Sequence, residues 1–137
     1  MKLLTGLSLA SLVLASVFVS TPRTYGQECT SVIVESGKND NRFLRLHLSN
    51  QEGCVAVYGF YVQMERNGSV QQITTTPSGW SFGESETSAF WMTDTDPINA
   101  DSKVFGMKLQ TQRPYTFHWI ALDQSWSSIA EGVLTGY

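Results

Sequence analysis

Single apolar residues alternate with single polar residues along several segments of this 137-residue chain. In residues 42–49, for example, Leu44, Leu46 and Leu48 occupy every second position and polar residues separate them. A repeat of two residues is typical of a β-strand with one buried face. After the first 26 residues, no window shows the spacing of an amphipathic helix. The pattern therefore predicts an all-β fold.

Eight short segments are predicted as strands, and turn-forming residues separate them. They are residues 32–35, 42–49, 54–65, 70–75, 87–93, 103–110, 115–122 and 129–135. The Asn67-Gly68 pair between the third and fourth segments is a strong hairpin signal. Short strands at regular spacing are typical of two packed antiparallel sheets. We therefore expect one antiparallel β-sandwich of about 7–8 strands.

Loop positions follow from the strand count, because each loop of an antiparallel sandwich reverses the chain. With eight strands, residues 94–102 and 123–128 fall at one end, and residues 76–86 fall at the other. Trp80 and Trp126, which lie in two of these loops, are then expected at opposite ends of the domain.

The N-terminus has the layout of a secretory signal peptide. Lys2 precedes a mainly apolar stretch over residues 3–19, and small residues stand at Thr24 and Gly26 before the expected cut. Cleavage after Gly26 leaves residues 27–137 as a single β-sandwich domain, secreted or held in the cell envelope outside the cytoplasm. The alternative is an uncleaved anchor, but the apolar run is slightly shorter than the roughly 20 residues that a membrane span needs.

Charge limits the partners of the mature domain. The full chain has 9 basic and 12 acidic residues, and cleavage removes Lys2 and Arg23, so the net charge changes from −3 to −5. An acidic surface disfavours nucleic acids and anionic membranes as partners. We expect no membrane insertion after cleavage, and a protein or glycan at the cell surface as the partner.

Two cysteines are present, Cys29 and Cys54. An even count in an exported domain predicts a disulfide bond, and both residues lie at the beginning of predicted strands that start at the same end. The alternative, a metal or redox pair, lacks the close cysteine spacing and the histidine cluster of such sites. The triplet that begins at Asn67 is a candidate N-glycosylation site.

No pattern of a known catalytic or cofactor site stands out. The two histidines, His47 and His118, lie far apart on predicted strands, and no GxSxG or HExxH motif occurs. Glu84 and Glu86 could form a carboxylate pair, but two acidic residues in one loop are typical of a solvated turn. We therefore predict a binding or structural domain without catalytic activity; the alternative is a secreted enzyme with an unrecognised site.

Two sets of loop residues are candidate binding sites. Asp94, Asp96, Asp101 and Asp123 are predicted at one end of the sandwich, where carboxylates could hold Ca²⁺. Aspartate is also a favoured turn residue, and this interpretation, with no bound cofactor, is the one that we expect. Trp80 and Trp126 are the second set, because a loop tryptophan can stack on a sugar ring or anchor a protein. A carbohydrate-binding module that uses one of them is therefore a further alternative function. Either tryptophan can instead fold back to cover the core.

The second half of the chain resembles a known family. Its features are Pro77-Ser78-Gly79-Trp80, Phe90-Trp91, Asp96-Pro97-Ile98, residues 104–109, residues 117–123 and Gly132-Val133-Leu134. This pattern of strand aromatics and turns resembles immunoglobulin-like or fibronectin-like β-sandwich domains of archaeal or bacterial secreted and surface proteins. The resemblance implies an immunoglobulin-like sandwich in an extracellular setting, whereas the Cys-Trp-Cys spacing of antibody domains is absent.

Overall fold

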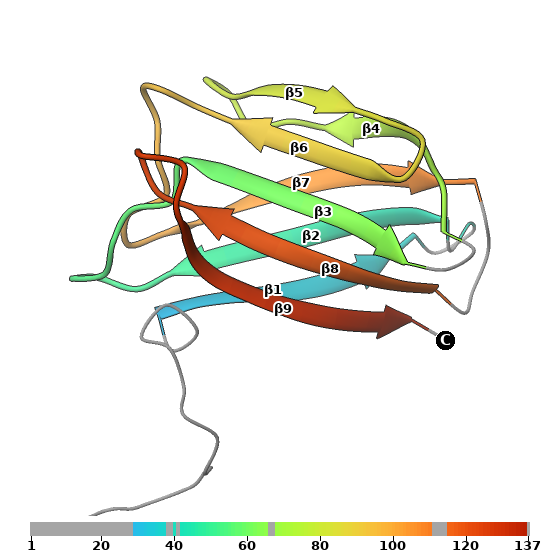
Figure 1. Ribbon diagram of the computed structural model, residues 1–137, viewed down its shortest axis with the longest axis horizontal. Helices are drawn as coiled ribbons and strands as arrows, with labels where there is room; N and C mark the ends of the chain where they lie inside the picture. Colours follow the sequence, from blue (N-terminus) through green and yellow to red (C-terminus); the bar gives the residue numbers. More distant parts are fainter. Residues whose placement is uncertain (1–28, 38–39, 41, 66–67, 111–114, 137) are drawn as a thin grey trace, which may run out of the picture.

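Nine β-strands make up most of the computed structural model, which describes residues 29–37, 40, 42–65, 68–110 and 115–136 (Figure 1). The strands are β1 (Thr30–Ser36), β2 (Phe43–Asn50), β3 (Gly59–Glu65), β4 (Val70–Thr75), β5 (Ser81–Glu84), β6 (Ser88–Met92), β7 (Ser102–Leu109), β8 (Tyr115–Leu122) and β9 (Ser128–Gly136). The predicted signal peptide, residues 1–26, and the glycosylation candidate Asn67 lie outside the described residues.

The strands form two sheets that pack face to face. One sheet has the order β1-β2-β7-β4, and the other has the order β5-β6-β3-β8-β9. Every hydrogen-bonded pair of named strands is antiparallel. The predicted antiparallel β-sandwich is therefore confirmed, with nine strands in place of eight. Within the described residues, no helix is long and apolar enough to span a membrane.

The core lies between the two sheets and is built from alternate strand residues, as the period-two pattern requires. Leu44, Leu46 and Leu48 are all buried on the inner face of β2. At the centre, the ring of Phe105 on β7 lies 5.0 Å from that of Phe60 and 5.2 Å from that of Trp91, between centroids. Aromatic packing between the sheets therefore holds the middle of the sandwich together.

The ninth strand, β5, corrects the prediction of a loop over residues 76–86. All four of its residues are exposed, so β5 lacks the alternation of buried and less buried positions that marks β2 and β8. Its pairing with β6 makes it an edge strand. The strand predicted over residues 54–65 also begins later, at Gly59, because Val57 pairs instead with Ile98 in an isolated bridge.

One additional strand reverses the expected end of every later loop. With nine strands that alternate in direction, the β2–β3, β4–β5, β6–β7 and β8–β9 loops gather at one end, on the left in Figure 1. The prediction that Trp80 and Trp126 lie in loops at opposite ends is therefore wrong. The loops that carry the four aspartates still share one end, as expected.

The disulfide bond between Cys29 and Cys54 is confirmed, with the two Cα atoms 6.0 Å apart. It joins the start of β1 to the β2–β3 loop, and both lie at the end where Trp126 is found. The bond therefore closes a loop that contains the whole β1–β2 hairpin.

The strand positions match those of an immunoglobulin variable domain, but the chain visits three of them in a different order. The four-stranded sheet corresponds to strands A-B-E-D, and the β3-β8-β9 group corresponds to strands C-F-G. After β3 the chain crosses to the D position as β4, so the two strands lie in different sheets and the hairpin predicted between them is wrong. The chain then returns as β5 and β6 to the edge that a variable domain fills directly after strand C.

Position 106 on β7 requires glycine because β4 approaches β7 closely there. Replacing Gly106 with a larger residue tests this packing. A Cβ atom at Gly106 would lie 2.7 Å from Oγ1 of both Thr74 and Thr75. We expect Gly106→Ala to lower the free energy of unfolding by about 1–3 kcal/mol, because crowding forces β4 to shift. Gly83→Ala is the matched control, since nothing lies within 4 Å of its added Cβ. Denaturant unfolding that shows equal stabilities for the two variants would contradict this account.

Candidate functional site

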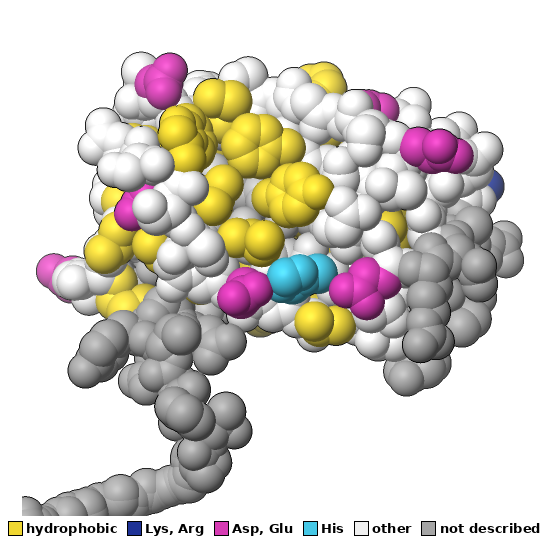
Figure 2. All heavy atoms as spheres, viewed as in Figure 1, with side chains coloured by type: hydrophobic (Ala, Val, Ile, Leu, Met, Phe, Trp, Pro, Cys, Tyr) yellow, Lys and Arg dark blue, Asp and Glu magenta, His cyan; other side chains and the backbone are white. Residues whose placement is uncertain are grey.

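The outer face of the five-stranded sheet carries a cluster of half-exposed apolar side chains. The strand register sets Phe90, Tyr61 and Ile120 side by side on β6, β3 and β8. Their neighbours along each strand point into the core, so these three point outward. We name as the aromatic face the side chains of Tyr61, Phe90, Met92, Ile120, Leu122 and Trp126. Figure 2 shows hydrophobic side chains gathered on this side of the molecule.

Trp126, in the β8–β9 turn, has a backbone conformation that is rare for a bulky residue. Its φ angle is 65°, in the left-handed region that glycine and asparagine usually occupy. Asp123 holds the turn, because its Oδ1 accepts hydrogen bonds from the backbone N–H groups of Ser125 and Ser127 at 2.8 and 2.9 Å. Strain of this kind persists where the surrounding structure over-determines it, and it concentrates at functional sites.

A glycine on the neighbouring strand makes room for the indole of Trp126. A Cβ atom at Gly59 would lie only 3.0 Å from Cζ3 of Trp126, so a larger residue would displace the ring. Phe90 contacts the same indole edge-to-face, with 6.2 Å between ring centroids. The indole is therefore supported by the sheet, yet 43% of Trp126 remains exposed.

Hydrogen bonds also fix Tyr61 and the polar side chains beside the aromatic face. The hydroxyl of Tyr61 donates to Oε1 of Gln63 at 2.6 Å, and Nε2 of Gln63 donates in turn to the backbone and hydroxyl oxygens of Thr87. Nε2 of His118 lies 2.8 Å from Oε1 of Glu131 on the adjacent strand. A surface that is already ordered loses less side-chain entropy when it binds a ligand.

Trp80, the other loop tryptophan, is buried with only 8% of its surface exposed. Its Nε1 donates a hydrogen bond of 2.9 Å to the backbone oxygen of Asp96, and its ring packs edge-to-face on Phe105. Trp80 therefore covers one end of the core, which is the alternative that its loop position left open.

The four candidate calcium ligands are used mainly within their own loops. Asp96 pairs with Lys103 at 3.1 Å, Asp101 accepts a hydrogen bond from the backbone of Asn99, and Asp123 holds the β8–β9 turn. Asp94 is exposed. Within the described ranges, no three acidic, histidine or cysteine side chains come together as a metal site. Calcium binding here stays a prediction, and the contacts match those of ordinary turn residues.

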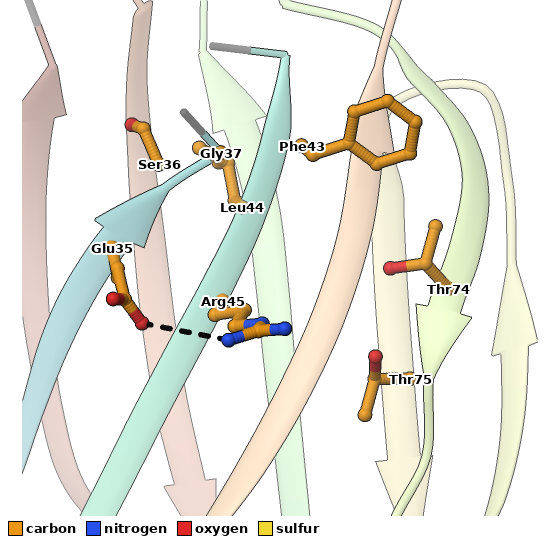
Figure 3. A pocket seen from close by; sticks show the side chains of 8 residues that line it. All are labelled: Glu35, Ser36, Gly37, Phe43, Leu44, Arg45, Thr74 and Thr75. Carbon is orange, nitrogen blue, oxygen red and sulfur yellow. Dashed lines mark ion pairs between the residues drawn. The ribbon is translucent and has the colours of Figure 1, made fainter. Parts of the chain in front are cut away.

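A shallow hollow of about 480 Å³ lies on the opposite side of the molecule, over the four-stranded sheet (Figure 3). Glu35, Arg45 and Phe43 line one part of it, and Thr74 and Thr75 line another. The Glu35 and Arg45 side chains form a 4.0 Å ion pair and are both more than half exposed. Water therefore solvates the charged lining of the hollow, which gives it little means to select a ligand.

One ion pair near this hollow has a clear electrostatic effect. The Arg42 side chain donates hydrogen bonds to both carboxylate oxygens of Asp40, at 3.0 and 2.9 Å, and lowers the pKa of Asp40 to about 2. Both residues belong to the β1–β2 loop, at the end away from Trp126. The pair closes this loop and contacts no part of the aromatic face.

Comparisons with known proteins give little further information. No family model matches the chain, and no curated protein matches its sequence. Among solved structures, ChBD2 from Thermococcus kodakarensis KOD1 is similar with a TM-score of 0.45 and 10% sequence identity, over 77% of this chain and 97% of that chain. This likeness is distant, so we base the proposed function on the side chains of this chain alone.

Proposed function

We propose that this chain is an exported, non-catalytic domain that binds a glycan on its aromatic face. The observation that carries the proposal is Trp126, whose indole is held half exposed on the sheet by a strained turn. An indole that served only the core would be expected to be buried, as Trp80 is. A strained residue with an exposed ring is better explained by contact with a ligand.

The chemistry of the face suits a sugar. One side of a pyranose ring presents C–H groups that stack on an aromatic ring, while its hydroxyl groups need hydrogen-bonding partners nearby. Trp126 and Tyr61 supply the rings, and Gln63 and His118 lie in the next row of the same sheet. Aromatic side chains with a polar partner close by are common where one part of a ligand is apolar and another is polar.

The open shape of the surface supports binding without catalysis. Catalytic groups usually converge in a cleft that excludes water, whereas the aromatic face is the exposed side of a sheet. The face could also bind a protein surface, and a glycan-binding assay separates these ligands.

Export is the second part of the proposal. Residues 1–26 would be the cleaved signal peptide, and residues 27–137 would fold outside the cytoplasm. The disulfide between Cys29 and Cys54 supports this location, because such bonds persist in oxidising compartments. Mass spectrometry of the mature protein would test it, and a mature N-terminus at Met1 would contradict it.

The test of binding compares two aromatic substitutions on opposite faces. Tyr61→Ala should weaken binding by roughly 5- to 30-fold, the range for losing about 1–2 kcal/mol of contact. Phe43→Ala is the control, because Phe43 is a partly exposed aromatic residue of β2 on the outer side of the other sheet. Electrophoresis through gels that contain soluble polysaccharides, with pull-down on insoluble ones, measures the effect. If the wild-type protein is retained by no glycan, the proposed function is wrong.

A further inference from the structure

We infer that the ligand of the aromatic face is a single, uncharged glycan chain, and not a crystalline polysaccharide surface or an anionic polysaccharide. This inference rests on the proposed function and narrows it. Two independent observations carry it: the angles between neighbouring rings and the distribution of charge over the two sheets.

The rings of the aromatic face do not form a flat platform. The ring of Phe90 contacts those of Tyr61 and Trp126 and is tilted by 57° from the first and by 61° from the second. A crystal face is planar and can lie parallel to only one ring of each adjacent pair. A single chain can turn about its glycosidic bonds, so successive sugars can follow rings of different tilt.

Ring spacing leads to the same conclusion. The Tyr61 and Phe90 centroids are 6.4 Å apart, and the Phe90 and Trp126 centroids are 6.2 Å apart. Stacking on such closely spaced, tilted rings needs a ligand that presents edges as well as faces, as one exposed chain does. Chains packed in a crystal present only one side.

The charges on the five-stranded sheet favour a neutral glycan chain over an anionic one. The five strands of this sheet contain no lysine or arginine, and Glu65 and Glu131 lie on its outer side. The basic residues among those described, Arg42, Arg45, Lys103 and Lys108, all belong to the four-stranded sheet or its flanking turn. Among the described residues of this sheet, a carboxylated or sulfated chain on the aromatic face would therefore meet carboxylates and neutral groups but no lysine or arginine, and Coulomb repulsion would weaken its binding.

Polar side chains beside the rings can form hydrogen bonds with the hydroxyl groups of a neutral chain. The register aligns Ser88, Gln63 and His118 in a row across β6, β3 and β8, next to the row of Phe90 and Tyr61. A chain that lies across the strands can stack on one row while its hydroxyl groups meet the other. The two rows thus give a single chain both kinds of contact at once.

The inference is tested on the full purified protein with pairs of polysaccharides. The two members of a pair have the same sugar backbone and differ either in charge or in crystallinity. The soluble probes are hydroxyethyl cellulose against carboxymethyl cellulose, and glycol chitin against carboxymethyl chitin. The insoluble probes are acid-swollen against crystalline cellulose, and colloidal against crystalline chitin. On the backbone that is bound, we expect at least tenfold tighter binding to the neutral polymer at low salt, with a smaller difference at high salt. We also expect several-fold more protein on the swollen or colloidal form, for equal accessible area.

Reversing the charge of one residue tests whether the preference for neutral polymers arises at this face. Glu65 is exposed and points outward from β3, so Glu65→Lys should narrow the gap between neutral and anionic polymers by several-fold. Its matched control is Glu35→Lys, which makes the same change of charge at an exposed residue over the four-stranded sheet, on the opposite side of the molecule. Equal binding to both members of a charge pair, or preference for the crystalline form, would overturn the inference while the proposed function stands. Retention by no glycan would overturn both.

Discussion

Replacing Trp126 with asparagine is expected to reduce glycan binding by 30-fold or more, the loss that corresponds to about 2 kcal/mol at a hot-spot residue. Thermal stability should change little, because two effects oppose each other. Asparagine tolerates a positive φ angle, so the change relieves backbone strain on the order of 1–2 kcal/mol. It also removes the contacts of the indole with Gly59 and Phe90, which are of similar magnitude because the ring is only partly buried.

Separate measurement of binding and melting temperature distinguishes a ligand-binding role from a structural one. Isothermal titration with the bound polysaccharide gives the affinity, and calorimetry gives the melting temperature. Unchanged affinity would remove Trp126 from the site. A large fall in melting temperature, comparable to that of a core substitution, would show that the indole mainly supports the fold.

The second large effect is expected in the core. Phe105→Ala should lower the free energy of unfolding by about 3–5 kcal/mol, as truncation of a buried phenylalanine usually does. Phe105 is fully buried, and its ring contacts those of Phe60, Trp80 and Trp91 at centroid distances of 5.0–5.2 Å. Its loss would leave a cavity between the two sheets. The net free energy of unfolding of a small domain is only about 5–15 kcal/mol, so this substitution should remove a large fraction of the total stability.

The control for this substitution is again Phe43→Ala. Phe43 is on β2, next to β7, but on the outer side of the same sheet, where its ring faces the ammonium group of Lys108 at 4.8 Å. Losing an exposed contact of this kind should cost less than about 1 kcal/mol. Urea unfolding of both variants measures the difference. Equal destabilisation would mean that the centre of the sandwich is less tightly packed than the ring contacts indicate.

Alternation of buried and exposed residues explains why most strands could be predicted from the sequence. Residues 42–49 were predicted to alternate with three leucines inward, and β2 buries those leucines. The disulfide was also predictable, since only two cysteines exist and both precede strands. Strand β5 was missed for the complementary reason: all its residues are exposed, so it carries no burial pattern. Pairing with β6, which the sequence does not reveal, makes it a strand.

The candidate site could be predicted only in part. Trp126 was identified from its loop position, but so was Trp80, and nothing in either loop indicates which indole the fold buries. Tyr61 alternates with Phe60 and Val62, but its strand has apolar residues on both sides, so the sequence does not show which side faces outward. Gly59 becomes informative only when the indole is seen against it. The tertiary contacts, and not the local pattern, assemble the aromatic face.

The position of the disulfide has a mechanical consequence. Because nine strands alternate in direction, β1 begins at one pole of the domain and β9 ends at the other, so tension between these two points runs along the strands. The bond between Cys29 and Cys54 carries that load past the β1–β2 hairpin, directly to the segment before β3. The hairpin is thus shielded from stretching, and the pulling force falls on the sheet that carries Trp126.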